Sequence, residues 1–341
     1  MFGCEKVSIQ PTTTCVDDAS FIINPSHPKA TDIQSVMDKY VARGIPGMTV
    51  LINDDNGFWI ASSGMADIEN GIEMQPCHIN KLGSVTKMFM GTLVWQLIQD
   101  GALSIDDKIS KYIPEVANNI ENGNDITIGM LLNHTSGIYD IARDLGYNLA
   151  VINDMTKVWT EEEILNYIEG KPATNLPGEE LNYSNSNTLL AGMIIEVASG
   201  QTHAEFLKSR ILNPLGMNNT VYYNYSEDFP LSHLAQGYLD LNNDGGSIQN
   251  ISNLNPGSGN GYTGVYSTVT DMYKFINALL REKTLTTPDN LDFILNNTVG
   301  TTDGSWRSSY GSIHNEQRDV FDGSILAYGH AGGDIGYSAN L

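Results

Sequence analysis

Residues 84–101 read SVTKMFMGTLVWQLIQDG. From Val85 to Asp100 this stretch is apolar on nearly every side, and Gly101 ends it. It is too long for a strand, and a helix that is apolar all round is normally buried. We therefore predict a buried central helix here, with the rest of the domain packed around it.

Ser84 and Lys87 have the spacing S-x-x-K at the start of this predicted helix. Positions i and i+3 share one helix face, so the lysine amine can take the serine proton and make the hydroxyl a nucleophile. Backbone N–H groups at a helix start favour developing negative charge. Enclosure by apolar residues disfavours the charged form of the amine. We predict Ser84 as the nucleophile and Lys87 as its base.

This spacing alone is weak, because a chain of this length contains on the order of one copy by chance. Ser26 and Lys29 form a second copy. We discount it because Pro28 and its loop-like surroundings cannot hold the pair on a rigid helix.

Two further motifs strengthen the first. Tyr183-Ser184-Asn185 precedes an apolar helix and offers a phenol for proton relay and an amide that can hold both the lysine and a substrate carbonyl. His330-Ala331-Gly332-Gly333 stands in the last predicted strand, where glycines let the backbone approach a substrate. The N–H groups of Ser84 and Gly333 would form an oxyanion hole, in which each donor contributes roughly 3–4 kcal/mol.

These three motifs, in this order, resemble those of the serine β-lactamases and penicillin-recognising enzymes. The resemblance is to the class C-like branch, with its DD-peptidases, D-aminopeptidases and family VIII esterases. The segment Leu131–Ile138, LLNHTSGI, is similar to a further signature of that family, with a structural role. The resemblance covers most of residues 30–341.

The resemblance implies an α/β (α+β) fold. An antiparallel β-sheet flanked by helices would stand beside an all-helical subdomain, at about residues 105–260, with the site between them. The hydrolase domain would span 31–341, after a tether over 1–30. The family continues into further strands and a terminal helix, which we expect to be missing here.

The same resemblance implies an acyl-enzyme on Ser84, with Lys87 and Tyr183 as the acid/base pair, and needs no metal or cofactor. The residues assigned to substrate binding are Asn185, His330, Gly332 and Gly333. Lactamases usually carry Lys-Thr-Gly in the third motif, whereas His330 is mostly neutral at pH 7 and Ala331 lacks a hydroxyl. Efficient penicillin hydrolysis is therefore not expected.

The expected activity is that of a DD-peptidase or D-amino-acid amidase on a small or peptide substrate. A family VIII-like carboxylesterase or a weak β-lactamase is the alternative within the enzyme class. A non-catalytic penicillin- or peptidoglycan-binding protein is the alternative outside it, although binding alone needs no activated nucleophile.

The net charge limits the kinds of macromolecule that the protein is expected to bind. With 40 acidic against 18 basic residues the net charge is -22, which repels phosphate backbones, so nucleic acid is not expected.

Met1-Phe2-Gly3-Cys4 resembles the trimmed end of a bacterial lipoprotein signal, which would give an exported, periplasmic or lipid-anchored protein attached at Cys4. Cys15 and Cys77 either pair as a disulfide or stay as two thiols.

Periodicity and turn signals place the other elements. We expect a helix from Thr31 to Gly44, strands at 48–53 and 57–62, and one strand at 325–341. Capping boxes at Thr160 and Thr202 begin two more helices. Residues 240–264 are expected to form a long loop. Two weak patterns within it, G-x-G-x-x-G at 259–264 and half a calcium loop at 240–245, are interpreted as a loop and a polar turn.

Overall fold

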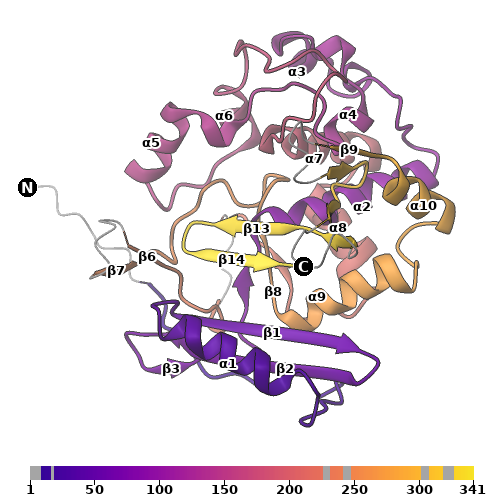
Figure 1. Ribbon diagram of the computed structural model, residues 1–341. Coiled ribbons are helices and arrows are strands. Elements are labelled where there is room, and N and C mark those ends of the chain that lie inside the picture. The colour runs from indigo at the N-terminus through magenta and orange to yellow at the C-terminus, as the bar shows by residue number, and fades with distance from the viewer. Residues whose placement is uncertain (1–8, 17–18, 226–230, 241–246, 301–306, 318–325) are drawn as a thin grey trace, which may run out of the picture.

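The computed structural model describes residues 9–16, 19–225, 231–240, 247–300, 307–317 and 326–341 (Figure 1). Its α-helices are α1 (Ala30–Val41), α2 (Thr86–Gln99), α3 (Pro114–Asn119), α4 (Ile128–Leu132), α5 (Leu145–Asn153), α6 (Glu161–Leu165), α7 (Asn185–Ser199), α8 (His203–Leu207), α9 (Val269–Ile276) and α10 (Pro288–Asn296). Within this part of the chain, no helix is long and apolar enough to cross a membrane.

The strands are short apart from the first two. They are β1 (Gly47–Asp54), β2 (Gly57–Asp67), β3 (Ile72–Glu73), β4 (Asn80–Lys81), β5 (Val221–Tyr222), β6 (Tyr238–Asp240), β7 (Ile248–Asn250), β8 (Val265–Ser267), β9 (Thr298–Gly300), β10 (Arg307–Ser309), β11 (His314–Gln317), β12 (Leu326–Gly329), β13 (Ala331–Asp334) and β14 (Tyr337–Asn340).

Helix α2 lies at the centre, as predicted. Phe89 stacks on Phe275 of α9 with ring centroids 3.8 Å apart, and the Trp95 indole donates to the Tyr310 carbonyl at 2.7 Å. A Cβ at Gly91 would lie 2.4 Å from the Gly311 carbonyl oxygen, so only glycine permits this close approach. The helix is preceded by a 3-10 turn, Gly83–Val85, which holds Ser84.

The named strands pair antiparallel, which confirms the predicted mixed fold with antiparallel sheet. β1 and β2 form a long ribbon from Gly47 opposite Gly64 to Asp54 opposite Gly57, and α1 packs against it. In Figure 1 the β13–β14 hairpin lies between this ribbon and the helical part that contains α3 to α7. Strand β13 of this hairpin packs on the turn that holds Ser84.

One predicted element is wrong. The single strand expected at 325–341 is three strands, because a turn at Ile335 and Gly336, with φ +84° at the glycine, separates β13 from β14. Small and apolar residues alternate through that turn as they do in a strand, so the sequence pattern does not indicate it. Within the range 105–260, expected to hold the helical subdomain, the helices extend to Leu212, where a π-helical turn ends, and β5 to β7 follow.

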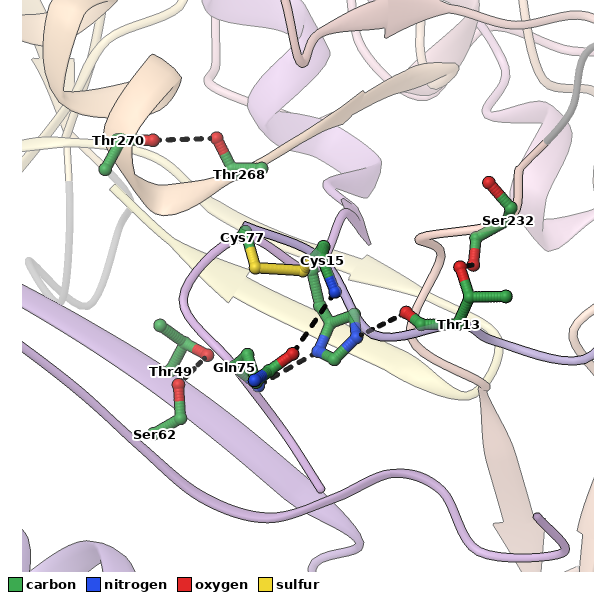
Figure 2. The surroundings of a disulfide bond; sticks show 10 residues. Thr13, Cys15, Thr49, Ser62, Gln75, Cys77, Ser232, Thr268 and Thr270 are labelled. Atoms are coloured by element: carbon green, nitrogen blue, oxygen red, sulfur yellow. Dashed lines mark hydrogen bonds between the residues drawn. A yellow bond between two sulfur atoms is a disulfide. The ribbon is translucent and has the colours of Figure 1, made fainter. Parts of the chain in front are cut away.

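The described part of the predicted tether is bound to the domain. The Thr12 amide donates to the Asp67 carboxylate at 3.0 Å, and the Thr13 amide donates to the Ser232 carbonyl at 2.7 Å. Cys15 and Cys77 form a disulfide, beside which the Cys15 amide donates to the Gln75 side chain at 3.3 Å (Figure 2). Cys4 and the calcium-loop pattern after Asp240 lie outside the described residues.

Reduction of the Cys15–Cys77 bond is expected to lower the free energy of unfolding by about 4 kcal/mol. The bond closes a loop with a sequence separation of 62, and that loop gains conformational entropy in the unfolded chain once the bond is broken. Urea unfolding of a Cys4→Ser protein with and without reductant measures the effect. A Cys77→Ser variant should show no response to reductant, and equal midpoints for all samples would contradict the prediction.

Candidate active site

The turn before α2 fixes the Ser84 backbone against two strands. The Leu82 amide donates to the Val265 carbonyl at 3.0 Å, and the Val265 amide donates to the Thr86 hydroxyl at 3.1 Å. A Cβ at Gly83, where φ is +50°, would lie 2.4 Å from the carbonyl oxygen of Gly333 on β13. Glycine at position 83 therefore lets the two backbones predicted to form the oxyanion hole touch.

Lys87 is fully buried, and its amine meets three oxygen acceptors. Nζ donates to Ser84 Oγ at 3.0 Å, to Asn185 Oδ1 at 2.8 Å and to the Tyr262 carbonyl at 2.9 Å. Burial lowers the pKa of Lys87 to about 7, although the negative charge of Asp140 opposes that shift. An amine that is half neutral near pH 7 can accept the Ser84 proton.

Tyr183 completes the group around Ser84. Its ring lies 5.2 Å from Lys87 Nζ and packs on the His134 ring with centroids 4.4 Å apart. Burial raises the pKa of Tyr183 far above its usual value, and a hydrogen bond with Ser84 offsets part of that rise. The phenol therefore stays protonated at neutral pH, where it can give a proton rather than take one.

Asn185 begins α7, and its side chain links Lys87 to an acidic residue. Asp140 Oδ1 accepts from both the Asn185 backbone amide, at 2.9 Å, and Asn185 Nδ2, at 3.0 Å. Asp140 itself is only 7% exposed. The structure thus brings together Ser84, Lys87, Tyr183 and Asn185, which are far apart in the sequence.

The third motif lies beside them, with a different role for each glycine. A Cβ at Gly332 would lie 1.9 Å from the Leu82 carbonyl oxygen, so packing on the Ser84 turn explains that glycine. A Cβ at Gly333 would meet no described atom within 4 Å, so this position faces open space. His330 is 3% exposed, and its ring centroid lies 6.2 Å from that of Tyr183.

Two contributors were missed in the sequence. The Tyr262 carbonyl, which accepts from Lys87, belongs to the 259–264 pattern that we interpreted as an ordinary loop. A backbone carbonyl has no signature in a sequence, although three glycines within six residues mark an unusual backbone. Asp140, the partner of Asn185, follows the 131–138 segment by two residues and could have been found by its place beside that signature.

A partly buried cluster of ionisable groups contacts the loop that contains Tyr262. His203 Nδ1 lies 2.7 Å from a Glu196 carboxylate oxygen, and its Nε2 lies 3.0 Å from the Gly259 carbonyl. Burial raises the pKa of Glu161, the third member, to about 7. These three side chains have their ligand atoms within 4.8 Å of one another, close enough to bind one metal ion, but each ring nitrogen of His203 already has a protein partner.

The Beta-lactamase family model matches residues 33–341. The chain belongs to the beta-lactamase family. It is 30% identical over 209 residues to Protein flp of Staphylococcus aureus (strain MW2), an alignment that covers 60% of this chain and 40% of that protein. The chain thus matches about two fifths of the length of such curated relatives.

Two solved structures align with most of this chain. The D-stereospecific amidohydrolase from Streptomyces sp. has a TM-score of 0.80 and 26% identity, covering 91% of this chain and 89% of that one. The D-amino acid amidase from Ochrobactrum anthropi SV3, complexed with L-phenylalanine amide, has a TM-score of 0.78 and 28% identity, covering 90% and 85%. Family membership and these neighbours support a serine hydrolase, as the sequence predicted.

Proposed function

We propose that this chain hydrolyses amides of D-amino acids, or short peptides with D-residues, through an acyl-enzyme on Ser84. The observation that carries the proposal is the buried Lys87 amine, with a pKa lowered to about 7, at 3.0 Å from Ser84 Oγ. The two amidase neighbours, which cover about nine tenths of the chain, support the substrate class.

The proposed acylation begins with proton transfer from Ser84 Oγ to neutral Lys87. Oγ then bonds to the amide carbon, and the N–H groups of Ser84 and Gly333 hold the oxyanion. The lysine proton passes through the Tyr183 phenol to the leaving nitrogen as the C–N bond breaks. Water then attacks the ester carbon, its proton returns by the same groups, and the acid leaves with Ser84 restored.

The third motif supports amides over β-lactams. A lactam substrate carries a carboxylate that a fixed lysine charge and a hydroxyl would bind, and His330 and Ala331 supply neither. The carboxylesterase alternative uses the same acyl-enzyme, so only relative rates separate the two activities.

A side-by-side substrate panel tests the proposal. We expect D-phenylalanine amide to be hydrolysed with a kcat/KM at least about 100-fold above that of the L-enantiomer, and a chromogenic cephalosporin to be turned over poorly. Measurements on D-alanyl-D-alanine would separate peptidase from amidase activity. Fast hydrolysis of p-nitrophenyl esters without D-amide turnover would favour the esterase, and a stable penicillin adduct without any turnover would favour the binding protein.

A further inference from the structure

Asp140 has no role in the proposed reaction, yet its carboxylate lies one side chain away from the Lys87 amine. Asp140 Oδ1 accepts two hydrogen bonds from Asn185, one from the backbone amide at 2.9 Å and one from Nδ2 at 3.0 Å. The other end of the same amide, Oδ1 of Asn185, accepts from Lys87 at 2.8 Å. One carboxylate oxygen therefore fixes both the backbone and the side chain of Asn185.

The chemistry of these contacts allows only one orientation of the Asn185 amide. An ionised carboxylate is an acceptor only, so the NH₂ end of the amide must face Asp140. The carbonyl end is then left to face Lys87 Nζ. Without Asp140 the amide could turn by 180° and present N–H groups to the lysine, which would remove an acceptor from the amine.

We propose that Asp140 is a positioning residue for catalysis: it locks the Asn185 amide so that its carbonyl oxygen holds the Lys87 amine beside Ser84. The proposal rests on the acyl-enzyme mechanism above. It gives the segment after the Leu131–Ile138 signature a role in the reaction, where the sequence indicated only a structural one. Asp140 bonds Asn185 and, among the described residues, has no contact with Ser84, so it acts through Asn185.

The charge of Asp140 gives the proposal a readout that simple loss of structure would not change. Its negative charge favours the protonated form of Lys87 and so raises the lysine pKa, against the larger effect of burial. Among the described residues, the other groups that face Lys87 are Asn185 Oδ1, Ser84 Oγ, the Tyr262 carbonyl and the Tyr183 ring. Arg143, which is largely exposed, faces Asp140 with Nε 3.8 Å from Oδ2.

The test compares Asp140→Ala with Asp140→Asn in steady-state kinetics with D-phenylalanine amide across pH. We expect the alanine variant to lose about 10- to 100-fold in kcat/KM, the range for a hydrogen bond to a charged group. The asparagine variant keeps an acceptor oxygen for Asn185 and should recover most of that loss. In both variants the rise of kcat/KM with pH should move to lower pH, because the lysine loses a nearby negative charge.

A double-mutant cycle and a matched control complete the test. In an Asn185→Ala background, Asp140→Ala should lower kcat/KM by less than about 3-fold, because the side chain that Asp140 positions is gone. Asp271, another buried aspartate, lies on α9 and accepts hydrogen bonds from the Asn219 amide, the Thr220 hydroxyl and the Lys274 amine. Asp271→Asn should leave the pH profile unchanged.

Equal losses in kcat/KM from Asp140→Ala in the wild-type and Asn185→Ala backgrounds, together with an unshifted pH profile, would overturn the proposal. If Asp140→Ala does not fold, Asp140→Ser replaces it in the cycle: a loss in kcat/KM that disappears in the Asn185→Ala background supports the proposal, and an equal loss in both backgrounds overturns it. These outcomes leave the acyl-enzyme on Ser84 intact. An unmodified Ser84 in the wild-type enzyme during turnover would instead refute the proposed function itself.

Discussion

Replacement of Ser84 by alanine is expected to lower kcat by about 10⁴-fold or more for every substrate that the enzyme turns over. The variant keeps the oxyanion donors but lacks the atom that bonds to the acyl carbon, and nucleophile deletions in serine hydrolases have effects of this size. Covalent labelling by a fluorophosphonate should disappear at the same time. Thermal unfolding should show a folded protein, because only one side-chain oxygen is removed.

Ser26 offers a matched control within the same chain, because Ser26 and Lys29 repeat the S-x-x-K spacing. Ser26 lies before α1 and its backbone amide donates to the Asn24 side chain at 3.0 Å, far along the chain from α2. Ser26→Ala should label and turn over like the wild type. Labelling that survives Ser84→Ala would show that another side chain is the nucleophile.

The pH dependence of kcat/KM is expected to show a rise with a midpoint near pH 7. Lys87 must be neutral to take the Ser84 proton, and burial lowers its pKa to about 7, so activity increases as pH rises through that value. Lys87→Met should lose about 10²–10⁴-fold in kcat/KM, the usual contribution of a general base, and should lack the rise. Rates of D-phenylalanine amide hydrolysis from pH 5 to 10 give the profile.

Lys81 is the control for this prediction, because it is a second fully buried lysine whose pKa burial lowers, to about 8. Its amine donates to the Tyr225 phenol at 2.6 Å and to the Ser252 carbonyl at 2.8 Å, without a contact to Ser84. Lys81→Met should lower stability and keep the midpoint near pH 7. A wild-type profile that rises only near pH 10 would show that Lys87 stays charged and is not the base.

The sequence predicted those parts of the site that side chains define. Ser84, Lys87, Tyr183 and Asn185 carry distinctive chemistry at recognisable spacings, and the structure places them within contact of one another. The apolar run after Ser84 predicted the buried helix α2, because it is too long for a strand and is apolar on nearly every side.

The missed parts depend on contacts between segments that are distant in the chain. Asp140 lies 45 residues before Asn185. Its place beside the 131–138 segment could mark it as a candidate, but neither segment indicates that it contacts Asn185. The Tyr262 carbonyl could not be predicted, since every residue has one. The Cys15–Cys77 pairing stayed open because two cysteines give no measure of their separation in space, and the turn at Gly336 was hidden in a continuous strand-like pattern.

Mass spectrometry of the enzyme quenched with acid during turnover of a slow D-amino acid ester or amide tests the central claim most directly. We predict a mass increase equal to the acyl part of the substrate, mapped after digestion to the peptide that contains Ser84 and absent from Ser84→Ala. An adduct on any other residue, or continued turnover with Ser84 unmodified throughout, would contradict the account.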